Sequence, residues 1–94
     1  MNLSKKSIVE TIRFIVLHHE RLLNLAKKDG YYKPGFAFRT LESSKNYLFG
    51  LTLLFIGDTA ITKEIEQAEQ DMEAITERFE QQFTIEQNKQ QQAA

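Results

Sequence analysis

The sequence contains no cysteine and no tryptophan, one proline and four glycines in 94 residues. Without cysteine the chain forms no disulfide and offers no thiolate for a metal site or for nucleophilic catalysis. The scarcity of proline and glycine leaves long uninterrupted stretches, whereas an all-β domain needs a turn every ~8–12 residues. These absences favour a helical protein, and the lack of cysteine fits a reducing cytoplasm.

Long hydrophobic runs are also missing. The most apolar stretch, residues 47–56, is about half as long as the ~20 residues that a membrane-spanning helix needs. At the N-terminus, Glu10 and Arg13 interrupt the apolar residues that follow Lys5 and Lys6, so no signal-peptide core forms. We therefore expect a cytoplasmic protein that has no membrane partner.

The composition, with 41% hydrophobic and 27% charged residues, is that of a folded globular chain. The length suits one domain, which we expect to cover residues 1–84. The polar, glutamine-rich end, residues 85–94, is expected to be a flexible tail.

A net charge of −1 conceals a strong asymmetry along the chain. Residues 1–45 hold nine Lys and Arg against four Asp and Glu, whereas residues 58–83 hold two against eight. The two parts should attract each other. We interpret this as an acidic third helix lying beside the basic half of its own bundle; pairing between two copies is the alternative.

Residues 5–28 are predicted to form the first helix, starting at Ser4 or Ser7. Ser7 and Glu10 have the spacing of a capping box, and Gly30 supplies a left-handed stop. At 100° per residue, one face collects the positions Ile8, Ile12, Ile15, His19, Leu22 and Ala26.

Two further helices are predicted, over residues 40–56 and 59–83. Thr40 is the expected N-cap of the second helix and Asp58 or Thr59 that of the third. From Tyr47 onward apolar residues surround the axis of the second helix. The third carries a narrow apolar stripe with steps of three and four, formed by Ile61, Ile65, Ala68, Met72, Ile75 and Phe79.

These elements predict an all-α three-helix bundle completed by homodimerisation. The first two helices have more apolar surface than the narrow stripe of the third can cover, so a patch should stay exposed for a second copy. The candidate oligomer-interface residues are Phe14, Leu17, Leu25, Phe49, Leu53 and Ile56.

No catalytic or metal site is expected. Neighbouring helical residues point ~100° apart, so His18 and His19 cannot both face one ion unless other helices supply ligands, and no third histidine exists. We interpret His19 as a core or interface histidine with one hydrogen-bond partner. The acidic third helix offers no apolar wall to raise a carboxyl pKa, and no phosphate loop or nucleophile motif occurs. The chain is therefore predicted to be no enzyme and to need no cofactor.

One connecting segment is richer in aromatic and basic residues than a connector needs. Its candidate partner-binding residues are Tyr31, Tyr32, Lys33, Phe36, Phe38 and Arg39. They either close the end of the bundle as core plugs or bind a partner.

The predicted function is that of a small non-catalytic interaction protein, a regulator, inhibitor or adaptor, which binds itself and another protein. One alternative is nucleic-acid binding through the basic half and the aromatic segment. Another is a small-ligand pocket between subunits near His18 and Arg39.

Overall fold

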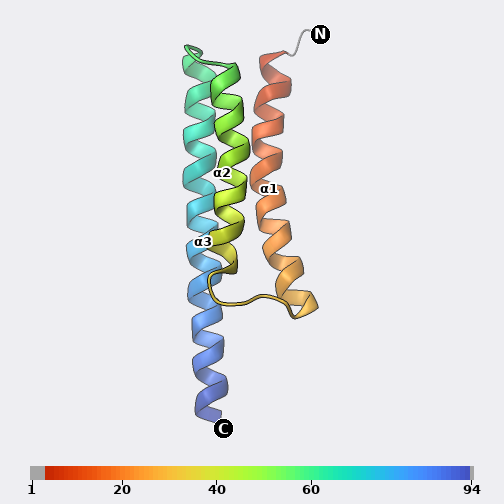
Figure 1. Cartoon of the computed structure of the whole chain (residues 1–94), viewed down its shortest axis with the longest axis vertical. Helices are drawn as coiled ribbons and strands as arrows, with labels where there is room; N and C mark the ends of the chain where they lie inside the picture. The colour runs from red at the N-terminus through yellow and green to blue at the C-terminus, as the bar shows by residue number, and fades with distance from the viewer. Residues whose placement is uncertain (1–3, 94) are drawn as a thin grey trace.

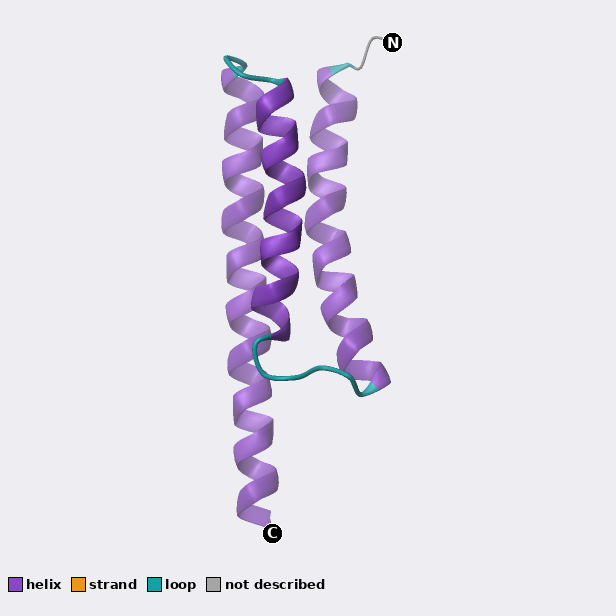
Figure 2. Ribbon diagram, viewed as in Figure 1, coloured by secondary structure: helices purple, strands orange, loops and turns teal. Residues whose placement is uncertain are grey.

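The computed structural model describes residues 4–93, and within that range it contains helices and no strand. In chain order the helices are α1 (Lys5–Asp29), α2 (Phe36–Leu54) and α3 (Thr59–Ala93). They lie side by side and alternate in direction, forming a bundle (Figures 1 and 2). The all-α, three-helix prediction is confirmed.

α1 begins and ends where local side-chain chemistry directs. The Ser4 hydroxyl accepts the backbone N–H of Ser7 at 3.2 Å, so the earlier of the two predicted caps is used. The helix ends at Asp29, and Gly30 follows with φ 81°, a left-handed conformation that glycine adopts at little cost.

α2 differs from its predicted bounds, 40–56, at both ends. It starts at Phe36, because Gly35 turns the chain with φ 82° and serves as the N-cap. Thr40 is no cap: its hydroxyl donates back to the Phe36 carbonyl at 3.0 Å from inside the helix. α2 ends at Leu54, two residues earlier than predicted. Half of the aromatic segment is therefore helical.

α3 starts at Thr59 as predicted, with the Asp58 carboxylate accepting the Ile61 N–H at 3.1 Å. It runs on to Ala93 instead of ending at residue 83. No glycine or proline follows Gly57, and the Glu, Gln, Lys and Ala residues of this end are good helix formers. Because helix ends fray, the flexibility of residues 85–94 stays a prediction.

The core consists of two clusters of buried apolar side chains stacked along the bundle. The first joins all three helices through Ile8, Ile12, Leu41, Leu48, Ile61, Ile65, Ala68 and Met72. The second, at the α1–α2 connection, contains Leu23, Ala26, Tyr32, Ala37 and Phe79. In the described part of the chain, no helix has the length and hydropathy required to cross a bilayer.

Candidate functional site

The aromatic segment is divided between core and surface. The Tyr32 ring is buried and packs against Phe36 and Phe83, with centroids 5.3 and 4.9 Å away. Its hydroxyl donates a hydrogen bond to the Glu80 carboxylate at 2.6 Å. Burial of the hydroxyl raises the pKa of Tyr32, and this hydrogen bond raises it further to a smaller extent. Tyr32 and Phe36 therefore close the end of the second core cluster.

The other four candidate residues of this segment face solvent. Tyr31 and Phe38 are each 52% exposed, and Lys33 and Arg39 are exposed as well. Neither Lys33 nor Arg39 forms an ion pair with any residue that the structure describes. A partner can thus reach these four side chains. Tyr32 and Phe36 instead pack in and against the second core cluster.

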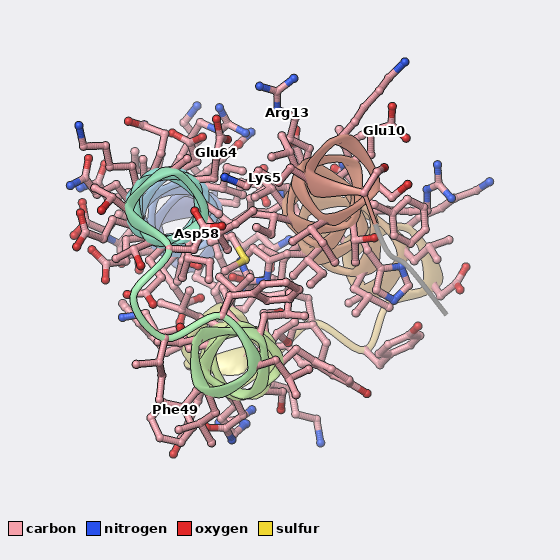
Figure 3. All side chains as sticks on the ribbon, turned by 90° about the horizontal axis from the view of Figure 1, so that it is seen from above. Lys5, Glu10, Arg13, Phe49, Asp58 and Glu64 are labelled. Carbon is pink, nitrogen blue, oxygen red and sulfur yellow. The ribbon has the colours of Figure 1, made fainter. Side chains whose placement is uncertain are left out.

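The candidate oligomer-interface residues are all exposed, but they lie on two separate surfaces, one on α1 and one on α2 with the turn that follows it. Phe14, Leu17 and Leu25 lie on α1. Phe49 projects from α2 on the side away from α1 (Figure 3). Leu53 lies one turn beyond Phe49 on the same side of α2, and Ile56 is exposed in the turn that follows the helix. We call the second group, Phe49, Leu53 and Ile56, the α2 stripe.

Two further exposed side chains of α2 were not among the sequence candidates. Tyr47 is 73% exposed and Leu54 is 75% exposed, and they lie two turns apart on one side of the helix. Placing each residue at 100° on a helical projection separates this side from the α2 stripe. The apolar residues that surround the axis of α2 in the sequence thus form two exposed surfaces, on different sides of the helix.

A groove of about 300 Å³ runs between α1 and α2. Its lining residues are Phe14, Ile15, His18, Leu22, Thr40, Ser43, Ser44 and Tyr47. The rings of Phe14 and His18 stack at 6.0 Å with an interplanar angle of 12°. The residues that line this groove include His18 but none of the aromatic segment, so within one chain the groove does not join His18 to Arg39. A small-ligand pocket between two subunits stays a prediction.

His19 of α1 is fully buried and contacts a side chain of each of the other two helices, Ser44 of α2 and Thr76 of α3. Its Nε2 lies 2.9 Å from the Thr76 hydroxyl, which itself donates to the Met72 carbonyl at 2.7 Å. Thr76 has a single hydroxyl proton, so it accepts from His19 and the proton of the neutral ring belongs on Nε2. Ser44 Oγ lies 3.5 Å from Nδ1. Desolvation lowers the pKa of His19, and nearby Glu20 partly opposes that shift.

The charge asymmetry is satisfied within the chain. Four ion pairs join a basic residue of α1 or α2 to an acid at the start of α3 or within it: Lys5–Asp58, Arg13–Glu64, Lys27–Glu86 and Lys45–Glu73. A fifth, Arg78–Glu20, runs in the opposite sense. The acidic helix lies beside the basic half of its own bundle, as interpreted from the sequence. Such exposed pairs contribute little stability, but they favour one arrangement of the helices.

The two adjacent histidines point in different directions, since His18 is exposed beside Phe14 and His19 is buried. Across the described residues, no cluster of three or more His, Asp or Glu side chains could hold a metal ion. Comparison with protein-family models, with curated proteins and with solved structures finds no match.

Proposed function

We propose that this chain is a small non-catalytic interaction protein that acts as a homodimer and binds another macromolecule as a regulator, inhibitor or adaptor. The observation that carries this proposal is the amount of large apolar surface in contact with water. Among the described residues, twelve large hydrophobic side chains are at least 37% exposed. Exposed apolar side chains that gather on one side of a helix, as several of these do, are typical of sites where proteins associate.

The α2 stripe is the proposed site for a different protein. Phe49, Leu53 and Ile56 are 62, 55 and 78% exposed; Phe49 and Leu53 share one side of α2, and Ile56 lies in the turn directly after it. Apolar side chains one turn apart on one side of a helix are the usual anchors with which a helix packs into a partner's groove. The surface lies apart from the α1 residues, so self-association through α1 leaves it accessible.

A pull-down from cells that produce the protein tests this function. The bait is the full chain, compared with Leu53→Glu/Ile56→Glu and with Gln70→Glu, which adds charge at an exposed position of α3, away from the α2 stripe. We expect one protein to be retained by wild type and by the Gln70 variant and to be lost from the double variant, with unchanged helical circular dichroism. Equal retention by all three baits would refute the α2 stripe as the binding site.

The nucleic-acid alternative draws support from the exposed rings of Tyr31 and Phe38 beside Lys33 and Arg39. Against it, four of the basic residues of the N-terminal half are already paired with acids of α3 or its cap. Strongly salt-dependent gel-shift binding would favour nucleic acid over a protein partner.

A further inference from the structure

The outer side of α1 carries an apolar and charged pattern that its own bundle does not use. Glu10, Phe14, Leu17 and Arg21 follow one another with steps of four, three and four, so at 100° per residue they fall within ~60° of one line. All four are exposed, and Figure 3 shows Glu10 projecting from α1 away from the other two helices. We call these four residues the α1 stripe.

The order of residues in the α1 stripe is symmetric. The midpoint between Glu10 and Arg21 coincides with the midpoint between Phe14 and Leu17. A twofold axis crossing the helix there sets two copies of α1 antiparallel. Each Phe14 then lies opposite the partner's Leu17, and each Glu10 lies opposite the partner's Arg21.

The charges at both ends of the α1 stripe are available for such contacts. Neither Glu10 nor Arg21 forms an ion pair within residues 4–93, although five other pairs link the helices of the bundle. Opposite charges that flank an apolar helix seam set the orientation and register of paired helices. We infer that a second copy of this chain covers the α1 stripe in an antiparallel twofold contact, with two Glu10–Arg21 pairs around a Phe14–Leu17 centre. This inference rests on the proposed homodimer and names its surface and register.

The area is adequate for a stable dimer. Through Phe14 the α1 stripe is continuous with the α1–α2 groove and with Tyr47. The exposed apolar side chains on this side are Phe14, Leu17, Leu22, Leu25, Tyr47 and Leu54. Taking ~200 Å² for a fully exposed large side chain, they present roughly 700 Å² per copy. The charged ends of the stripe and His18 add to this, approaching the ~800 Å² per partner of a standard interface.

A charge-swap series measured by sedimentation equilibrium at low salt tests the contact. We expect wild type at twice the 11.0 kDa chain mass. Glu10→Arg and Arg21→Glu should each turn two attractions into two repulsions and raise the dimer Kd about tenfold. The double variant Glu10→Arg/Arg21→Glu should restore the wild-type Kd. High salt should reduce the differences in Kd between wild type and the single variants, because it screens the charges. Glu77→Arg, at an exposed and unpaired position of α3, is the control and should dimerise like wild type.

Three other outcomes would each contradict one part of the inference: the homodimer, its surface or its register. A wild-type chain that stays at 11.0 kDa refutes the homodimer itself, and the α1 contact with it. A dimer that ignores the charge swaps but dissociates on Phe49→Glu/Leu53→Glu keeps the homodimer and moves it to the α2 stripe. A double variant as weak as the single ones refutes the antiparallel register. Circular dichroism on each variant shows that the monomer is folded.

Discussion

His19 Nε2 lies 2.9 Å from Thr76 Oγ1, which joins α1 and α3 by a hydrogen bond in the centre of the core. Both side chains are fully buried, so water cannot replace either partner. A mostly apolar core thus contains a buried polar contact whose geometry defines how two helices align.

Thr76→Val should therefore destabilise the protein. Valine keeps the shape but leaves the His19 N–H without an acceptor, which costs about 1–3 kcal/mol of unfolding free energy. Thr84→Val is the control, because that hydroxyl is exposed and bonds only to the Glu80 carbonyl. Urea unfolding followed by circular dichroism measures both. Equal effects of the two changes would contradict a special role for the His19–Thr76 bond.

Acid should weaken the fold through His19. Burial lowers the pKa of His19 below its ordinary 6.5, so as pH falls the unfolded chain takes up this proton before the folded one. The unfolding free energy is then highest above about pH 6.5 and decreases as pH falls from there toward the lowered pKa.

The measurement is urea unfolding between about pH 5 and 7.5 at a constant protein concentration. His19→Gln, although less stable overall, should lose this part of the pH dependence, whereas His18→Gln should retain it because His18 is exposed. Parallel pH profiles for wild type and His19→Gln would refute the assignment.

Tyr32 and Phe38, two rings of the same segment, should respond differently to substitution. Tyr32→Phe removes the 2.6 Å bond to Glu80 from a buried ring and should cost about 1 kcal/mol. Phe38→Ser, at a half-exposed position, should change the unfolding free energy by less than ~0.5 kcal/mol. Thermal unfolding of both variants decides. A larger loss for Phe38→Ser would place that ring among the core plugs.

Two glycines with equally open surroundings provide a matched pair. A Cβ added at either Gly50 or Gly57 meets nothing within 4 Å, but Gly57 has φ 90° whereas Gly50 lies within α2. Gly50→Ala should raise the unfolding free energy by about 0.5–1 kcal/mol through helix propensity. Gly57→Ala should lower it by roughly 1–2 kcal/mol, because alanine disfavours the left-handed region. Chemical unfolding of both variants is the test, and shifts of the same sign would contradict it.

The interior of the bundle was largely predictable from the sequence. The apolar periodicity of residues 5–28 and 59–83 identified α1 and α3, and His19 was expected in the core or at an interface with one hydrogen-bond partner. The start of α2 was missed because a left-handed Gly35 cannot be recognised from the letters Pro-Gly, which fit several turns. The third helix was predicted to end ten residues too early, because the residues after 83 are mostly polar and show no apolar periodicity.

The candidate surfaces were predictable only in part. That Phe14 and Phe49 belong outside the core followed from their helical angles, and both are exposed. The sequence did not show that these two residues lie on separate surfaces, because this depends on which side of α2 faces α3. Contacts such as the Lys45–Glu73 ion pair define that side. Similarly, the aromatic composition of the α1–α2 connection did not distinguish the buried Tyr32 from the exposed Tyr31.

The sequence by itself determined that the chain is helical, that three segments form the helices and that the acidic third helix attracts the basic first half. These properties depend on the spacing and charge of residues close together in the chain. Only the tertiary structure decided that the α1 and α2 stripes lie on separate surfaces and that Tyr32 is buried while Tyr31 is exposed. A helix with apolar residues on several sides can bury any of them, and the choice is made by packing against residues far away in the sequence.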